Sequence, residues 1–311
     1  MILVTGGTGF IGKALIRHLV EAGYSTRLII RPSHRSPDIP PGVPVEVAIS
    51  NLSDERSLRA AMVGVDTIYH LVGVEKRGAY GDLMAVDIRG TQVLLNAALD
   101  AGVDRIFYIS HLGADRSSAY PVMKAKAIAE DYIRRSGINY TILRSAIVYG
   151  SGDGFTTSLV RLINSIPFIF LTPGDGRTLL QPLWVEDLAT CLVWALDEDR
   201  TRNETYEIGG PEQLTFNQIL LLIMQTMDIH RRTVQLRSPY LRGFTVFLET
   251  VFPGLPVSVF WLDYLAANHI CPLDTIPRVF NLLPARMSHQ IGYIQGIDWG
   301  APLIQLLFRR K

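Results

Sequence analysis

The sequence predicts an α/β protein with a doubly wound parallel sheet, followed by a small, mostly helical C-terminal lobe. Three observations carry this prediction. A short apolar strand at the N-terminus runs directly into a glycine-rich turn and an amphipathic helix. Strand and helix patterns then alternate as far as about residue 148. The strands are nearly continuous runs of Val, Ile and Leu, which is typical of parallel strands covered on both faces.

The elements follow in order along the chain. After the first strand, which ends at Thr5, we expect strands at residues 26–30, 45–49, 67–72, 105–110, 140–147 and 205–208. Helices are expected at residues 53–62, 82–101, 120–136, 185–196 and 215–227. Ser53 is a plausible N-cap of its helix, and Gly102 and Gly137 stand where two others stop. The remainder is punctuated by proline and is expected to be mostly helical.

This pattern predicts two regions. Residues 1–150 would form the dinucleotide-binding domain, to which residues 178–210 return by adding a strand and a helix. Residues 151–177 and 211–311 would form a smaller lobe for a substrate or a partner. That lobe is expected over the carboxyl edge of the sheet, where ligands of such sheets bind.

Composition excludes several classes of protein. The net charge of the 311 residues is +1, which gives no reason to expect nucleic-acid binding. Cys191 and Cys271 lie in apolar segments without metal-ligand spacing, so we expect buried thiols in a reducing compartment and no metal site. No signal peptide and no apolar run of about 20 residues is visible, so a cytoplasmic location is expected.

Two apolar segments leave alternatives open. Residues 244–267 are rich in aromatic side chains, and residues 303–311 are apolar and end in three basic residues. One interpretation is a core helix and a surface tail. The other is peripheral association with a membrane surface or with a membrane-embedded partner.

The spacing G-x-x-G-x-x-G at Gly6, Gly9 and Gly12 predicts a dinucleotide site, because it follows a strand and opens a helix. Gly6 allows the turn, Gly9 lets backbone N–H groups approach a pyrophosphate, and Gly12 lets the helix pack closely. The helix dipole favours the phosphate charge. The expected contacts here are those of the turn and first helical residues: Gly6, Thr8, Gly9, Phe10, Ile11 and Gly12.

Tyr120 and Lys124 stand four residues apart at the start of a predicted helix, so they share one face. A nearby ammonium stabilises a phenolate, and such a tyrosine can act as general acid or base in hydride transfer to or from a carbonyl. The lysine could also reach the nicotinamide ribose. The pattern therefore predicts a catalytic pair.

With these two motifs, the chain resembles the short-chain dehydrogenase/reductase superfamily and its Rossmann fold over about residues 1–230. The likeness is strongest to atypical members, which include NmrA-like proteins and the 39-kDa-type accessory subunit of respiratory complex I. It is carried by the glycine turn and by His70-Leu71-Val72-Gly73, Gly90-Thr91, Leu143-Arg144-Ser145 with Tyr149-Gly150, Val185-Glu186-Asp187-Leu188-Ala189 and Gly209-Gly210-Pro211.

The resemblance implies further site residues. Cofactor contacts are expected at Asn51, Leu52, Leu71, Val72, Gly73 and Val148. Ser110 is the candidate that would polarise a substrate carbonyl, with Ser117, Ser118 and His111 as alternatives. Two departures stand out, since the family's usual acidic residue after the third strand is Asn51 and its usual asparagine in the long helix is Asp87.

The charges after the second strand favour NADP(H) over NAD(H). An NAD site places an acidic residue there, whereas this chain has Arg31, followed by His34 and Arg35. Guanidinium groups suit a 2′-phosphate.

Three functions remain open from the sequence. The first is an NADP(H)-dependent oxidoreductase or epimerase/dehydratase-like enzyme with an unknown small-molecule substrate, using Tyr120, Lys124 and Ser110. The alternative is a non-catalytic NADPH-binding assembly factor or accessory subunit of a membrane assembly like complex I. A redox-sensing regulator of the NmrA kind is third.

Overall fold

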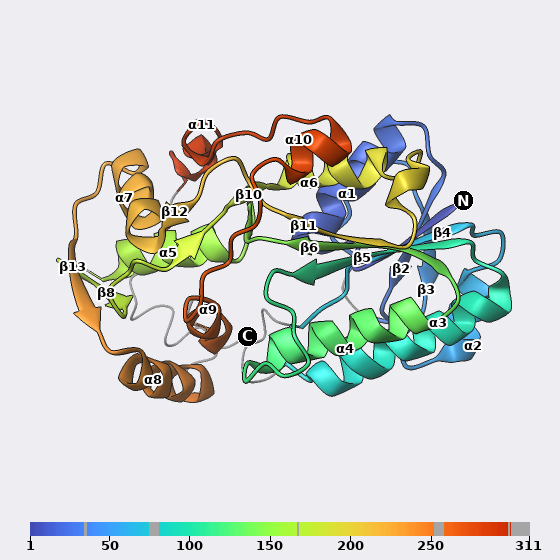
Figure 1. Ribbon diagram of the computed structural model, residues 1–311, viewed down its shortest axis with the longest axis horizontal. Coiled ribbons are helices and arrows are strands. Elements are labelled where there is room, and N and C mark those ends of the chain that lie inside the picture. The colour runs from blue at the N-terminus through green and yellow to red at the C-terminus, as the bar shows by residue number, and fades with distance from the viewer. Residues whose placement is uncertain (34–35, 75–80, 167, 252–257, 298, 300–311) are drawn as a thin grey trace.

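The computed structural model describes residues 1–33, 36–74, 81–166, 168–251, 258–297 and 299 (Figure 1). A seven-stranded sheet has the order β11-β6-β5-β4-β1-β2-β3, and every neighbouring pair in it is parallel. Its strands are β1 (Ile2–Thr5), β2 (Thr26–Ile30), β3 (Glu46–Ile49), β4 (Thr67–His70), β5 (Arg105–His111), β6 (Asn139–Ser145) and β11 (Glu204–Ile208). The strand order reverses between β1 and β4, and the predicted doubly wound fold is confirmed.

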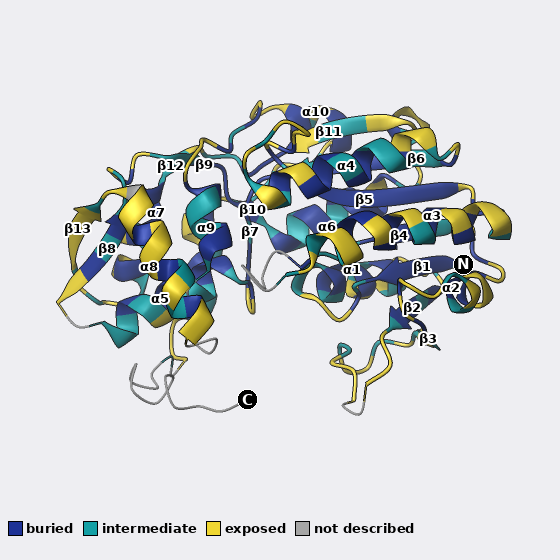
Figure 2. Cartoon of the chain, turned by 90° about the horizontal axis from the view of Figure 1, so that it is seen from below, coloured by how far each residue is buried: buried dark blue, intermediate teal, exposed yellow. Residues whose placement is uncertain are grey.

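Helices cover both faces of this sheet (Figure 1). On one face lie α1 (Phe10–Glu21) and α6 (Val185–Trp194); on the other lie α2 (Glu55–Ala61), α3 (Gly90–Ala101) and α4 (Pro121–Arg135). Alternate residues of each strand point to opposite faces. On β5, Phe107 and Ile109 therefore join the α1–α6 core, and Ile106 and Tyr108 join the α2–α3–α4 core. Figure 2 shows the central strands buried between these helices.

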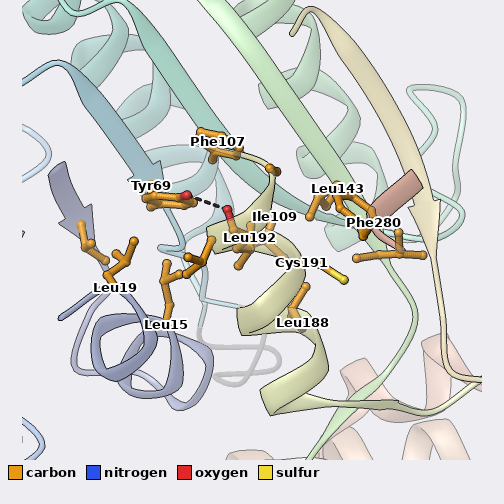
Figure 3. Packing of buried hydrophobic residues seen from close by; sticks show 14 of the residues in the cluster. Leu15, Leu19, Tyr69, Phe107, Ile109, Leu143, Leu188, Cys191, Leu192 and Phe280 are labelled. Atoms are coloured by element: carbon orange, nitrogen blue, oxygen red, sulfur yellow. Dashed lines mark hydrogen bonds between the residues drawn. The ribbon is translucent and has the colours of Figure 1, made fainter. Parts of the chain in front are cut away.

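A buried hydrogen bond connects β4 to α6 inside this core. The Tyr69 hydroxyl donates a hydrogen bond of 2.7 Å to the Leu192 carbonyl (Figure 3). The Tyr69 ring stacks on Phe107 with centroids 4.5 Å apart. Both buried free thiols were predicted, and burial raises the pKa of the Cys271 thiol to about 12.

The remaining elements build a second core beyond the sheet. Its helices are α5 (Phe155–Ser165), α7 (Phe216–Thr226), α9 (Val259–Tyr264), α11 (Met287–Gln290) and η4 (Ile291–Ile294), and α8 (Ser238–Val251) packs against α9. Three short strand pairs accompany these helices: β7 (Val148–Tyr149) with β10 (Leu183–Trp184), β9 (Leu179–Leu180) with β12 (Leu214–Thr215), and β8 (Ile169–Pro173) with β13 (Arg232–Leu236). Helix α10 (Thr275–Phe280) returns to pack beside α6 and β11.

The structure differs from the sequence prediction in several places. Strands β8 and β13 were not predicted, because each short segment becomes a strand only by pairing with the other. Asp54, not Ser53, caps α2, and its Oδ1 accepts a hydrogen bond from the Ser57 N–H at 3.1 Å. The long helix predicted at 82–101 begins instead with a π-helical turn, η2 (Met84–Arg89). Strands β4 and β6 end at His70 and Ser145, earlier than predicted, because the chain leaves the sheet at its carboxyl edge.

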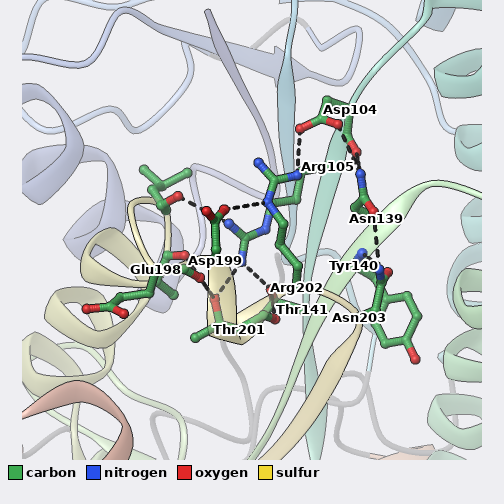
Figure 4. Close-up of polar contacts among 12 residues, drawn as sticks. Asp104, Arg105, Asn139, Tyr140, Thr141, Glu198, Asp199, Thr201, Arg202 and Asn203 are labelled. Carbon is green, nitrogen blue, oxygen red and sulfur yellow. Dashed lines mark hydrogen bonds and ion pairs between the residues drawn. The ribbon is translucent and has the colours of Figure 1, made fainter.

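Arg105, at the start of β5, ties the edge strand β11 to the sheet (Figure 4). Its guanidinium is buried and donates to the hydroxyls of Thr141 and Thr201 and to the Leu196 carbonyl, at 2.8, 2.5 and 3.1 Å. Burial lowers the pKa of Arg105 from its usual value. Leu196 follows α6, and Thr201 lies just before β11. The Arg105 side chain therefore holds the end of α6 and the start of the last strand together.

We expect Arg105→Met to lower the free energy of unfolding by about 3 kcal/mol, because it leaves several buried acceptors unpaired. Denaturant unfolding measures the change. The matched control is Arg59→Met, since the two carboxylate contacts of Arg59 are exposed and such pairs contribute less than about 1 kcal/mol. Equal losses for the two variants would contradict this account of Arg105.

Candidate functional site

The glycine turn after β1 presents backbone amides at the carboxyl edge of the sheet. Gly6 has a φ of +76°, and the Gly9 N–H donates to the Gly6 carbonyl at 2.9 Å. Helix α1 then starts at Phe10, with no side chain capping its first turn. First-turn amides that lack an internal partner, together with the helix dipole, form an anion site. Thr8 and Gly9 are exposed beside it.

The turn leaves no room for side chains, which is the condition for close approach of a pyrophosphate. A Cβ on Gly12 would lie 2.4 Å from the Gly6 carbonyl oxygen. A Cβ on Gly6 would lie 2.9 Å from the Leu71 carbonyl carbon, and the Gly6 backbone is in the left-handed region as well. The residues present therefore fit the diphosphate of a dinucleotide.

The predicted residues at the other end of the site lie after β2 and β3. Arg31 is exposed directly after β2, and Asn51 is exposed after β3, where its Oδ1 accepts from the Ser53 N–H at 3.3 Å. Leu52 is buried against Gly90 of α3. Arg35 and His34 lie outside the described residues. Asp38 is the first acidic residue after Arg31 in the sequence, and it forms an ion pair with Lys13 of α1.

A pocket opens beside the first turn of α1, across the carboxyl ends of β4, β5 and β6. Elements of the sheet domain form one wall, and α9 forms the other. The lining residues are Phe10, Ile11, Leu71, Ile109, His111, Lys126, Ser145, Ala146, Ile147, Val148, Gly154, Phe260, Trp261 and Tyr264. Of the predicted cofactor contacts, the structure thus brings Phe10, Ile11, Leu71 and Val148 together here. Val72 and Gly73 follow Leu71 and are half-buried.

Lys126 brings an ammonium group to the wall of this pocket. It is buried on α4, and its Nζ lies 3.2 Å from Oδ1 of the equally buried Asp87. The same Nζ lies 5.3 Å from the centroid of the Tyr108 ring. The second oxygen of Asp87 accepts from the Val74 N–H at 3.4 Å, which links the pair to the segment after β4. The sequence reasoning noted Asp87 but missed Lys126.

A neutral histidine lies beside this ion pair. His70, the last residue of β4, contacts the hydroxyls of Thr5 and Thr91 at 2.7 and 3.0 Å. Burial, and after it the charge of Lys126, lowers the pKa of His70 to about 3. His70 therefore stays uncharged at neutral pH and serves as a hydrogen-bonded link between β1 and α3.

The predicted catalytic residues lie elsewhere. Tyr120 is half-buried at the N-cap of α4, Lys124 is exposed, and neither lines the pocket. Lys124 and Lys126 are two residues apart, about 200° around the helix axis, so they cannot face the same side. Ser110 is buried, and its Oγ has no hydrogen-bond partner among the described residues. Neighbouring Ile109 and His111 line the pocket, whereas Ser110 does not. The assignment of Tyr120, Lys124 and Ser110 to catalysis stays a prediction.

One sequence signal could have identified Lys126. It lies three residues after Met123 and seven residues before Ile133, and this spacing places the three side chains on one buried face of the helix. Glu130, one turn further on, is also buried and accepts from Arg134 and Arg144 at 2.8 Å each. The search for a tyrosine four residues before a lysine selected Lys124 instead.

Comparison with known proteins agrees with this geometry. A family model described as NAD(P)H-binding matches residues 6–160. The chain is 33% identical over 245 residues to sterol demethylase protein B of Methylococcus capsulatus, covering 70% of this chain and 72% of the relative. This protein therefore belongs to the NAD(P)H-binding family.

Two further comparisons define its neighbourhood. The chain is 28% identical over 290 residues to the mitochondrial NADH dehydrogenase [ubiquinone] 1 alpha subcomplex subunit 9 of Arabidopsis thaliana, covering 90% of this chain and 67% of that protein. The triphenylmethane reductase of Citrobacter sp. superposes with a TM-score of 0.77 at 20% identity, covering 95% of this chain and 99% of the reductase. This last likeness shows the fold.

We expect Gly12→Ala to abolish dinucleotide binding and to destabilise the fold by about 2 kcal/mol, because the new Cβ forces α1 away from the turn. Titration with NADPH followed by fluorescence, together with thermal unfolding, measures both effects. Gly292→Ala is the control, since a Cβ there meets nothing within 4 Å. Wild-type NADPH affinity in Gly12→Ala would contradict the assignment of the turn.

Proposed function

We propose that this chain binds NADP(H) as a structural ligand and does not turn it over through a tyrosine–lysine pair. The observation that carries the proposal is the position of Lys126. Lys126 is the lysine among the described residues that line the pocket, and the residue one helical turn before it is Val122. A residue four positions earlier shares the face of Lys126, so an aliphatic group stands where a phenol would have to be.

The surrounding groups support binding. The uncapped first turn of α1 suits the diphosphate, and the Lys126 ammonium can donate to ribose hydroxyls near the far end of the pocket. When bound, a reduced nicotinamide can supply a hydride. Without turnover, the nucleotide stabilises the folded chain by mass action, since it binds the native state alone. The relative named as a subunit of an NADH dehydrogenase fits the role of an accessory subunit.

A second candidate, an oxidoreductase, is supported by His111. Its imidazole lines the pocket at the end of β5, facing Phe260 and Tyr264 with ring centroids 5.8 and 6.3 Å away. Histidine is a common general acid near neutral pH. The relative named sterol demethylase protein B fits this candidate. A carbonyl substrate would then be protonated by His111 and not by Tyr120.

The two lysines of α4 give the test of the proposed function. The double variant Lys126→Met/Asp87→Asn removes the buried pair together, so that no uncompensated charge is left in the core. We expect it to bind NADPH about tenfold more weakly, because a charge-assisted hydrogen bond to the ligand is lost. We expect it to keep most of its stability, because both charges of the buried pair are removed together. Lys124→Met, on the exposed side of the same helix, should bind as the wild type does.

If Lys124→Met bound NADPH more weakly than Lys126→Met/Asp87→Asn does, the assignment of Lys126 to the nucleotide site would be overturned. The same samples test turnover. The proposal expects bound NADPH to stay reduced when a panel of aldehydes and ketones is added. Carbonyl-dependent oxidation that disappears in Tyr120→Phe would contradict it and would establish the tyrosine as the acid. Oxidation that survives Tyr120→Phe but disappears in His111→Ala would support the second candidate.

The preference for NADP(H) is also a proposal, and it depends on Arg31. This arginine is exposed directly after β2, where an acidic residue would favour NAD(H). We expect Arg31→Ala to weaken NADPH binding about tenfold, because a guanidinium–phosphate contact is lost, and to leave NADH binding unchanged. Parallel titrations with the two nucleotides measure this. An equal loss for both nucleotides would show that Arg31 does not read the 2′-phosphate.

A further inference from the structure

Helix α8 exposes its apolar face. Tyr240, Phe244, Phe247 and Val251 follow one another at intervals of four, three and four residues, so they form a single stripe along the helix. Their exposed fractions are 69%, 51%, 57% and 48%. Figure 1 places α8 at the outer corner of the second lobe, away from the seven-stranded sheet. Four large apolar side chains in one exposed row indicate a contact surface.

The opposite face of α8 is buried although it carries polar groups. Thr245 and Glu249 are 5% and 7% exposed. The Glu249 carboxylate accepts from the Val259 N–H at 3.2 Å, at the start of α9. Arg242 pairs with Asp263 of α9, with Nε and Oδ1 2.7 Å apart. These contacts fix the rotation of α8, so the aromatic stripe cannot turn inward without breaking them.

The exposed charges at the N-terminal end of α8 are positive, whereas Glu249 and Asp263 beside it are largely buried. From Ile229 to Leu248 the chain contains four arginines and a histidine but no aspartate or glutamate. In the part of the chain that the structure describes, Arg232 and Arg237 have no ion-pair partner, and both are exposed. An apolar stripe with the exposed Arg237 just before its first residue is complementary to a surface that is apolar beneath and anionic on top.

We propose that α8 lies in the headgroup region of a membrane that contains anionic lipids, with the stripe Tyr240–Phe244–Phe247–Val251 facing the acyl chains. Aromatic side chains and arginines are favoured at this depth, where the rings contact hydrocarbon and the guanidiniums contact phosphates. Among the described residues no helix is long and apolar enough to cross a bilayer, so the attachment is at the surface.

A second copy of this chain is a poorer occupant. A two-fold contact between the N-terminal ends of the two stripes would bring the unpaired Arg237 of one copy towards Arg237 of the other, and like charges brought together are destabilising. An anionic bilayer neutralises the same arginines. The charge pattern therefore favours lipid over self-association.

Flotation with vesicles tests the proposal on the full chain. We expect the wild type to float with vesicles of phosphatidylcholine and phosphatidylglycerol, and to stay unbound with phosphatidylcholine alone. Phe244→Gln/Phe247→Gln should lower the bound fraction at least tenfold, and Arg237→Gln should weaken binding to the anionic vesicles. Both Phe side chains are exposed, so the fold is retained, which NADPH titration of the same samples checks independently.

Leu283→Gln is the matched control. Leu283 is 85% exposed in the loop between α10 and α11, on the other side of the molecule from α8 in Figure 1. Three results would each overturn the proposal. The first is vesicle binding by Phe244→Gln/Phe247→Gln equal to that of the wild type, and the second is an equal loss of vesicle binding in this double variant and in Leu283→Gln. The third is a wild type that does not bind anionic vesicles. A wild-type dimer that dissociates in the double variant, without vesicle binding, would assign the stripe to a second copy.

Discussion

A buried ammonium–carboxylate pair organises the carboxyl edge of this sheet. Lys126 comes from α4 and Asp87 from the π-helical turn η2, and Asp87 also holds the backbone after β4 through the Val74 N–H. Removing either charge alone would leave the other unpaired in the core, which is far costlier than keeping both. π-Helical turns are often found at functional sites. The pair thus sets the distance between α4, η2 and the strand ends that line the pocket.

The rest of the site follows from this arrangement. His70 is held neutral beside Lys126, so among these two neighbouring groups the positive charge lies on the ammonium group. The first turn of α1 faces the same edge, and the glycine turn keeps it clear of side chains. A ligand with a diphosphate at one end and hydroxyl groups at the other matches this distribution of donors. Because Val122 stands one helical turn before Lys126, the pocket lysine is not part of a pair in which a tyrosine precedes a lysine by four residues on one helix.

Sequence reasoning predicted the sheet well because its signals are local. The glycine spacing, the Val/Ile/Leu runs and Gly102 in the left-handed conformation after α3 each depend on a few neighbouring residues. The site was predicted less completely. Tyr120 and Lys124 have the expected spacing, but that spacing alone does not tell which of the two lysines faces the sheet, because this depends on how α4 packs against η2. Strands β8 and β13 were missed for a similar reason, because they pair across more than 50 intervening residues.

The most direct test of this account is a crystal structure of the protein with NADPH bound. The account predicts that the Lys126 Nζ lies within hydrogen-bonding distance of the nicotinamide ribose hydroxyls, with the diphosphate on the first turn of α1 and Tyr120 away from the nicotinamide ring. A complex in which Lys124 contacts the ribose and the Tyr120 hydroxyl faces the nicotinamide would contradict it, because the helix would then present the catalytic pair that the sequence spacing predicts.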